Sequence, residues 1–264
     1  TIEIIFDQLG DDISLYFDRP YHVSRIIGVA ESVEGVQKAE VWNGEWAMLP
    51  LASGEEAPVY LRGVPAGSIM FKPRLVAGRN LVPGDDHAVL VNHRLAVDEG
   101  IQVGDEIALE IGEEEAVWTV VGVSLNVNSG SDDFFVPFDA LAQMEGSVGR
   151  GTYVKVVCGS DDPVVQRNLV KALKDAYKEQ RVEVTGHWST SEGREQNRAT
   201  FGIMMSLLLS MAALAAIVGS IGLASTMSIN VVERSREIGV MRAVGASSVA
   251  IASIFVVEGV ILGL

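Results

Sequence analysis

Apolar residues are distributed very unevenly along this chain. No charged residue occurs between Arg198 and Glu233, and residues 201–229 are rich in Leu, Ile, Met and Ala. About 20 such residues suffice to cross the hydrocarbon layer of a membrane as a helix. A buried helix of a globular core is the alternative, but core helices rarely lack charge for so long. The pattern therefore predicts a transmembrane helix at 199–232, long enough to project beyond the bilayer.

A charged segment at 233–246 follows, and then a second apolar run at 247–264. Two serines at the start of this run suit a helix N-cap, so we expect the start of another transmembrane helix there. Its one charged residue, Glu258, is either a functional intramembrane carboxylate or, as we favour, a residue that faces the other helices. The sequence starts without methionine and stops within the apolar run, so both ends look like cuts through a longer protein.

The orientation in the membrane follows from the arginines. The short segment 233–246 carries three of them, and positively charged short loops are typically cytoplasmic. Two arginines also flank the other end of the helix, but they belong to a long domain, and long domains cross membranes largely regardless of charge. We therefore expect residues 1–198 to be extracytoplasmic and the protein to be a multi-pass protein of the plasma (inner) membrane.

Residues 1–198 contain two segments that each follow a strand–helix–strand pattern. The first comprises a strand at 13–17, a helix at 20–33 and a strand at 37–49, and the second a strand at 152–157, a helix from the N-cap Asp162 to Tyr177 and a strand at 181–184. Pro20 and Pro163 suit the first turn of each helix. The shared plan predicts two β-α-β units that form one α/β lobe.

Between the two units the pattern changes to short strands with turn residues. It predicts a strand at 88–91, a helix at 92–99 ended by Gly100, a hairpin of 103–111 with 116–123 around Gly112, and a loop at 129–133. The predicted fold class is therefore α+β. An α/β lobe at 11–65 plus 151–190 is split by a β-rich lobe at 66–150, and transmembrane helices follow.

Charge divides the chain at the same place as hydropathy. The chain has 20 Lys and Arg against 35 Asp and Glu, a net charge of −15, and residues 199–264 hold three bases and three acids. All of the net charge therefore belongs to residues 1–198. Nucleic-acid binding is disfavoured, because phosphate contacts need clustered Lys and Arg. With one cysteine, Cys158, a disulfide scaffold is excluded, and we interpret this residue as a small buried hydrophobe.

The residues give no sign of an enzyme. The chain has no phosphate-binding loop and no nucleophile-elbow motif. The histidines lack metal-ligand spacing, so we expect no metal and no cofactor; they are His22, His87, His93 and His187. Pairs of acids such as Asp11 and Asp12 do not fit a calcium loop, and turn or cap roles are preferred. We therefore expect no catalytic residues in this chain.

The charged segment carries a specific motif. Residues 233–246 follow the pattern E-R-x-R-E-I-G-x-x-R-A-x-G-A directly after the long apolar run, and in this they resemble the MacB/FtsX-like family of bacterial ABC transporter permeases. Further matches to the periplasmic core domain of that family occur at 78–79, 89–91, 95–96, 103–105, 119–123 and 135–137. The resemblance covers nearly the whole chain.

The resemblance implies a permease with four membrane helices and an ectodomain between the first two. Residues 199–232 would be the second helix, 247–264 the start of the third, and 233–246 the cytoplasmic segment that docks on an ABC ATPase. Family members pair as homodimers or with a paralogue. They use ATP binding to move the ectodomain, and they export substrates, release lipoproteins or activate cell-wall hydrolases.

The expected ATPase-coupling residues mix charged and apolar side chains. They are Glu233, Arg234, Arg236, Glu237, Ile238, Met241 and Arg242. Two i,i+3 ion pairs are expected among them, Glu233 with Arg236 and Arg234 with Glu237. A solvated helix end near lipid headgroups would explain the charges, but not the interleaved Ile238 and Met241, which form an apolar face for a partner.

Small residues recur every fourth position in the apolar helix. They are Ala212, Ala216, Ser220, Ala224 and Ser228. Such a stripe lets a neighbouring helix approach closely within lipid, although a helix rich in Ala and Ser also shows this spacing by composition alone.

Three functions are compatible with these features. The first is a permease subunit that couples ATP hydrolysis by a partner to extracytoplasmic work. The second is a transmembrane regulator that moves no substrate, and the sequence does not separate it from the first. The third is a ligand-sensing receptor, which is disfavoured because the chain re-enters an apolar run soon after the charged segment.

Overall fold

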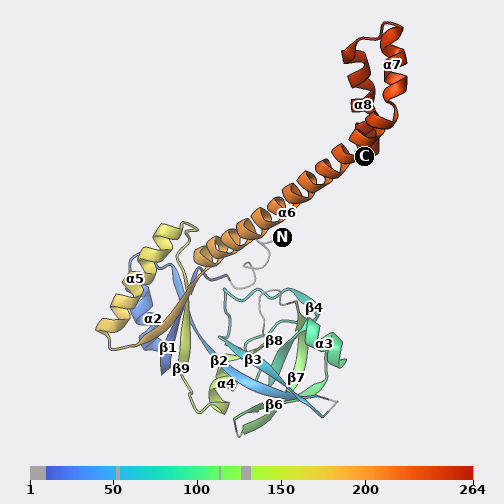
Figure 1. Ribbon diagram of the computed structural model, residues 1–264. Helices are drawn as coiled ribbons and strands as arrows, with labels where there is room; N and C mark the ends of the chain where they lie inside the picture. Colours follow the sequence, from blue (N-terminus) through green and yellow to red (C-terminus); the bar gives the residue numbers. More distant parts are fainter. Residues whose placement is uncertain (1–9, 52–53, 113, 126–131, 264) are drawn as a thin grey trace. The chain divides into compact units, whose positions relative to one another are not determined.

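The computed structural model describes residues 10–51, 54–112, 114–125 and 132–263 (Figure 1). The chain divides into two compact units, Thr1–Glu195 and Gln196–Leu264. The first unit contains the strands β1 (Ile13–His22), β2 (Lys38–Pro50), β3 (Glu56–Val64), β4 (Leu75–Gly78), β5 (Ala88–Asn92), β6 (Glu106–Ile111), β7 (Glu114–Ser124), β8 (Asp132–Pro137), β9 (Arg150–Val157) and β10 (Val184–Ser189). Its helices are α2 (Val23–Glu31), α3 (His93–Glu99), α4 (Phe138–Met144) and α5 (Pro163–Glu179). Helix α6 (Thr190–Glu233) begins in this unit, and α7 (Ser235–Ala243) and α8 (Ser248–Gly263) belong to the second.

The two predicted β-α-β units are present and interleave in one sheet. The strand order is β10-β1-β9-β2, and each neighbouring pair is antiparallel. Each unit therefore receives a strand of the other between its own two strands, which is the split β-α-β arrangement of ferredoxin-like folds. Helices α2 and α5 lie on one face of these strands (Figure 1).

Apolar spacing explains why α5 packs on this sheet. Its buried residues recur at helical intervals and are Gln166, Leu169, Val170, Leu173 and Tyr177. Asp162 accepts a hydrogen bond from the backbone N of Val164, and Pro163 occupies the first turn, as predicted. The Tyr177 hydroxyl donates to the carbonyl of Ile26 at 2.9 Å, which connects α5 to α2.

The β-rich lobe forms a ring that the sequence did not predict. Within the described residues, β2 pairs with β3, β3 with β8, β8 with β5, β5 with β7, β7 with β6, and β6 pairs back with β2. The ring encloses a separate core that includes Leu61, Leu109, Trp118 and Phe134. Closure gives each of these six strands at least two neighbours among the described residues, which protects strand edges from pairing with other chains.

The boundary between the lobes differs from the expected one. The sequence pattern assigns residues 11–65 to the α/β lobe, but β2 pairs with β9 only as far as Trp42 and with β3 from Asn43 onward. All of β3 then packs in the ring. The hydrophobic pattern of a long strand shows which residues are buried and not which neighbour buries them, so the sequence placed the boundary too late.

Several local predictions are confirmed. Helix α3 has Asn92 as its N-cap and ends at Gly100, which has a φ of 71°. Strands β6 and β7 form the predicted hairpin around Gly112, and Cys158 is buried.

Other local predictions are wrong. Pro20 lies in β1, where the register with β9 is irregular and no ladder hydrogen bond from its nitrogen is needed. The strand expected at 181–184 begins at Val184 instead, because Arg181 adopts a left-handed conformation with a φ of 54°. Of the loop expected at 129–133, residues 129–131 lie outside the described residues, and Asp132 already starts β8.

The second unit is helical. Of the described helices, α6 is long and apolar enough to cross a membrane by length and composition, and its most apolar stretch is fully exposed in the chain taken alone. Helix α8 is a shorter apolar helix, and Ser247 caps it by accepting a hydrogen bond from the backbone N of Ala250 at 3.2 Å. The expected cap and the expected apolar helix after it are both present.

Candidate functional site

The long helix α6 starts inside the folded first unit. Ser189 precedes its first residue, and the Ser189 hydroxyl accepts a hydrogen bond from the backbone N of Glu192 at 3.3 Å. A serine followed three residues later by glutamate is a known sequence signal for a helix start. The helix itself begins at Thr190, before the expected membrane-spanning segment 199–232, and its first turns are polar and carry no apolar periodicity.

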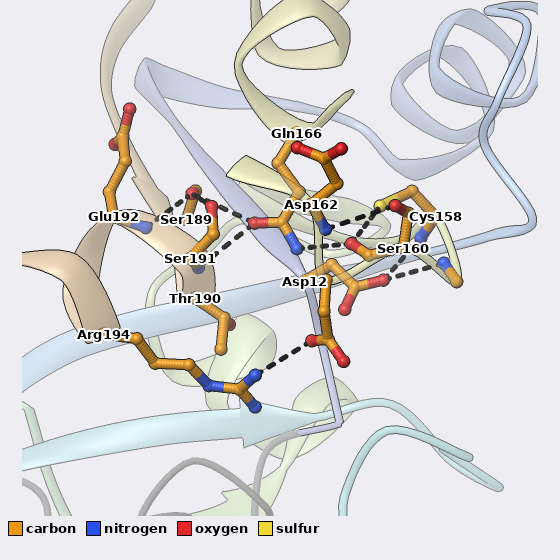
Figure 2. A network of polar contacts seen from close by, with 12 residues as sticks. Asp12, Cys158, Ser160, Asp162, Gln166, Ser189, Thr190, Ser191, Glu192 and Arg194 are labelled. Atoms are coloured by element: carbon orange, nitrogen blue, oxygen red, sulfur yellow. Dashed lines mark hydrogen bonds and ion pairs between the residues drawn. The ribbon is translucent and has the colours of Figure 1, made fainter. Parts of the chain in front are cut away.

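One buried amide side chain connects α5 to the start of α6. Gln166 is 0% exposed, and its Oε1 accepts hydrogen bonds from the Ser189 hydroxyl at 3.1 Å and from the backbone N of Ser191 at 3.2 Å (Figure 2). Its Nε2 donates to the carbonyl of Ser160 at 2.8 Å. Buried polar groups need such partners, and here one residue satisfies groups from three segments. Sequence reasoning missed Gln166, although a glutamine on the apolar face of a helix was the available signal.

The segment that enters β1 is hydrogen-bonded to the segment that leaves β10. Thr190 donates from its backbone N to the carbonyl of Asp12 and from its hydroxyl to the carbonyl of Asp11, both at 2.9 Å. The Asp12 carboxylate accepts from the backbone N of Cys158 at 2.7 Å and of Gly159 at 3.0 Å (Figure 2). The Asp12 carboxylate thus binds the backbone of a turn that is distant in sequence, rather than acting in a local turn or as a helix cap. The two strand ends and the β9–α5 turn form one polar junction, which we call the α6 base.

A buried ion pair lies beneath this junction. The Lys155 ammonium is 2.7 Å from Asp11 Oδ1, and the Ser14 hydroxyl donates to Asp11 Oδ2 at 2.6 Å. The ammonium also lies 4.6 Å from the centre of the Trp42 ring. Burial lowers the pKa of Lys155, and the neighbouring Asp11 carboxylate opposes this shift. Because Lys155 is 2% exposed, loss of Asp11 would leave a buried charge without its counter-ion.

Exposed ion pairs surround the α6 base. Arg194 pairs with Asp161 at 3.0 Å and Arg167 with Glu195 at 3.5 Å, and the His187 ring lies 3.4 Å from the Glu192 carboxylate. Exposed pairs of this kind contribute about 0–1 kcal/mol each. The free energy that holds the helix start therefore comes mainly from the buried hydrogen bonds.

The residues expected to couple to an ATPase lie at the other end of α6. Glu233 is its last residue, Arg234 lies at the break before α7, and the rest are on α7, namely Arg236, Glu237, Ile238, Met241 and Arg242. The charged residues of α7 are exposed, whereas Ile238 and Met241 are half-buried. The apolar face is thus partly covered by the chain itself.

The ion pair found in this region differs from the two expected ones. In the described part of the chain, Arg234 lies 3.8 Å from Glu258 of α8 rather than near Glu237. The break at Arg234 interrupts the continuous helix that i,i+3 pairing across 233–237 requires. Our interpretation of Glu258 as a residue that faces another helix is confirmed.

The stripe of small residues lies on α6 and is exposed, from Ala212 to Ser228. Ser220 donates to the carbonyl of Ala216 at 2.6 Å and Ser228 to that of Ala224 at 2.8 Å. Both hydroxyls are thereby satisfied within the helix, so the stripe presents no free donor to lipid or to a neighbouring helix.

Comparison with known proteins identifies relatives for both units. Residues 209–264 match the family model for the FtsX-like permease C-terminal region. An ABC transporter permease of Methanocaldococcus jannaschii is 27% identical over 71% of this chain and 47% of its own length. The ABC transporter permease YknZ of Bacillus subtilis is 24% identical over 100% of this chain and 69% of its own length.

A third relative is the macrolide export ATP-binding/permease protein MacB of Yersinia pestis biovar Antiqua, which is 32% identical over 54% of this chain and 22% of its own length. The chain thus spans about half the length of the Methanocaldococcus permease and a smaller share of MacB. The motif at 233–246 and the match at 209–264 lie in the same segment, and the relatives extend the similarity over the first unit. Residues 209–264 therefore match the FtsX-like permease family, and the chain as a whole is similar to ABC transporter permeases, MacB among them.

Proposed function

We propose that this chain is the permease subunit of an ABC transporter and that it couples ATP hydrolysis by a cytoplasmic partner ATPase to mechanical work outside the membrane. The work is export or the release of a lipoprotein. The observation that carries the proposal is α6 itself, a helix of 44 residues that begins in the buried α6 base and ends at the charged α7.

A helix suits the transmission of force because each turn is hydrogen-bonded to the next. Its first residues donate hydrogen bonds to the Gln166 side chain and to the carbonyls of Asp11 and Asp12, so a displacement of the helix acts on β1, α5 and β10 together. Its other end adjoins residues 233–246, which carry the family motif. This arrangement supports mechanotransmission rather than an open channel.

The proposed assembly follows from the family. The protein is a multi-pass protein of the plasma membrane. Residues 1–198 lie on the outer side of this membrane, and residues 233–246 lie in the cytoplasm against the ATPase. That partner, or a further domain, supplies the nucleotide site, since this chain has no phosphate-binding loop. A second permease subunit, identical or paralogous, packs within the bilayer, and the stripe from Ala212 to Ser228 is the face that we assign to helix packing.

The test interrupts α6 without altering its anchors. Gln196 and Asn197 are both exposed, and replacing both by glycine weakens the helix by about 1 kcal/mol per residue relative to alanine. In the full permease–ATPase complex, the double glycine variant should retain ATP hydrolysis but lose most ATP-driven work. The matched double alanine variant should keep both. Equal work in the two variants would exclude transmission through α6.

The orientation is tested separately with single cysteines in a Cys158→Ser background. A cysteine at the exposed Val164 should react with a membrane-impermeant thiol reagent from outside the membrane, and one at Ser235 should not. Labelling at Ser235 alone would reverse the proposed topology.

The match to the FtsX-like permease region favours one second candidate, a transmembrane regulator that moves no substrate and activates cell-wall hydrolases. Both candidates need an intact α6, so the glycine variants do not separate them. Efflux or lipoprotein release by the reconstituted complex identifies the first, and ATP-dependent hydrolase activation without transport identifies the second.

A further inference from the structure

The segment after α6 is a helical hairpin rather than a simple loop. Helix α7 follows the break at Arg234, the turn at 244–247 contains Gly245 with a φ of 105°, and α8 then runs back toward the end of α6 (Figure 1). The backbone N of Ala246 donates to the carbonyl of Met241 at 2.9 Å, which closes the end of α7. The described chain therefore reverses direction within four residues.

Two neighbouring residues of α8 show how far this helix extends back along α6. The Glu258 carboxylate lies 3.8 Å from the Arg234 guanidinium, and a side chain at Gly259 would lie 3.3 Å from the Met227 methyl group. Met227 and Arg234 are seven residues apart, which places them on one face of α6 and its extension. Residues 258 and 259 of α8 thus lie beside the last two turns of α6.

The position of this contact along α8 determines which residues lie beyond it. Ser248 starts α8 ten residues before Glu258, a rise of about 15 Å. These ten residues and α7 extend past the end of α6. Ile251 is buried here and Phe255 is half-buried, as are Ile238 and Met241 of α7, whereas the arginines of α7 are exposed. The hairpin thus turns these four apolar residues inward and its arginines outward, while other apolar residues such as Val244 and Val249 stay exposed.

A carboxylate in an otherwise apolar helix is costly near lipid unless a cation lies close to it. Glu258 is the one charged residue of α8. The Arg234 guanidinium, directly after the end of α6, lies beside the Glu258 carboxylate. Both residues are outside the apolar contacts of the hairpin. Their pairing therefore joins the two ends of the hairpin at the point where the hairpin meets α6.

We propose that Glu258 is a positioning residue that pairs with Arg234 to hold the hairpin Ser235–Val257 at a set angle to α6, and that this whole hairpin is the surface offered to the ATPase. The inference rests on the proposed function and deepens it. It extends the docking element from residues 233–246 into the first ten residues of α8. Glu258 acts through Arg234 and does not itself contact the partner.

The geometry is tested first, in the full permease in membranes and independently of any activity. With Cys158→Ser, a short bifunctional thiol reagent should crosslink Arg234→Cys to Glu258→Cys. It should not crosslink Arg234→Cys to Val249→Cys, because Val249 is exposed and about 13 Å further along α8. Equal crosslinking of both pairs, or none for Glu258, would overturn the proposed return of α8.

The role is tested by exchange of charge. Glu258→Arg and Arg234→Glu should each weaken ATPase association and lower the ATP-driven work per ATP hydrolysed about fivefold, and the double exchange should recover to within about twofold of the parent. Glu258→Arg combined with Arg236→Glu is the matched control and should show no recovery. Single variants that match the parent, or a double exchange no better than the singles, would overturn the positioning role.

The two tests also separate this inference from the proposed function. If the double glycine substitution at Gln196 and Asn197 leaves work unchanged, transmission through α6 fails, but the crosslink and the recovery of ATPase association by charge exchange still support the hairpin. If the glycine variant uncouples the complex and charge exchange gives no recovery, the hairpin inference alone fails.

Discussion

The two ends of α6 are held in opposite ways. At its start, Gln166, Ser189 and Thr190 make hydrogen bonds that are shielded from water, above the buried pair of Lys155 and Asp11. At its other end, the half-exposed pair of Arg234 with Glu258 and the closeness of Met227 to the position of Gly259 relate α6 to α8. Both ends carry a serine-capped helix and an ion pair, yet the surroundings of these groups differ.

The two ends differ in the free energy that is needed to separate their paired polar groups. A buried polar group that loses its partner suffers the full desolvation penalty, so the α6 base opens only with loss of local structure. An exposed ion pair exchanges its partner for water at little cost. The first end is thus suited to transmit a displacement, and the second holds the hairpin at its angle through contacts that cost less to open. Three predictions test this contrast.

The largest effect is expected at the buried ion pair. Asp11→Ala should lower the free energy of unfolding of the first unit by about 3–5 kcal/mol, because Lys155 becomes a buried charge without a counter-ion. All four tryptophans of the chain lie in residues 1–195, so tryptophan fluorescence during denaturant unfolding of the full chain reports on this unit.

Asp161→Ala is the matched control, since it removes the partner of Arg194 but is 78% exposed in its side chain and should cost less than about 1 kcal/mol. Replacing both buried partners, Asp11→Leu with Lys155→Met, should recover most of the lost stability. A similar loss for both single alanine variants would remove the distinction between the buried and the exposed pair.

A smaller effect is expected at the two serine caps, which have nearly equal geometry. Ser189 and Ser247 accept from backbone nitrogens at 3.3 Å and 3.2 Å, but the first is buried and the second exposed. Ser189→Ala should cost about 2 kcal/mol and Ser247→Ala about 0.5 kcal/mol. Hydrogen exchange of the first turns of α6 and α8 in the full permease measures both losses. Ser189→Thr retains the hydroxyl and should restore protection, whereas equal losses at both sites would contradict the role of burial.

The smallest effect is expected in the membrane segment between the two ends. Ala216→Leu or Ser220→Leu should reduce pairing of α6 with a neighbouring helix by about 1 kcal/mol, because the larger side chain prevents close approach of the backbones. Leu208→Ile and Leu214→Ile keep side-chain volume and should leave pairing unchanged. Crosslinking of the assembled permease in membranes distinguishes them. Equal yields in all four variants would mean that the stripe faces lipid.

Much of the local structure could be predicted from the residues alone. Some helix boundaries are set by local signals whose hydrogen bonds lie within a few residues. They are Asp162 with Pro163 and Ser247 at the starts of α5 and α8, and Asn92 and Gly100 at the two ends of α3. The apolar run of α6 was equally evident, because its composition needs no partner to be recognised.

The α6 base could not be predicted in the same way. Gln166 and Ser191 are separated by 25 residues and Asp11 and Thr190 by 179, and no local pattern relates residues so far apart. The start of α6 was missed for a related reason. Its first turns are polar and are held by distant groups rather than by an apolar face of their own.

Periodicity, composition and short spacings were enough to establish the two β-α-β units, the apolar helix, the charged segment with its family motif and the absence of a nucleotide-binding loop in this chain. The folded chain was needed to show that β2 is shared between two lobes, that six strands close into a ring, and that Glu258 returns to Arg234. Strand partners and ion pairs across a reversal of the chain are chosen by the geometry of packing, which apolar and polar positions constrain without specifying.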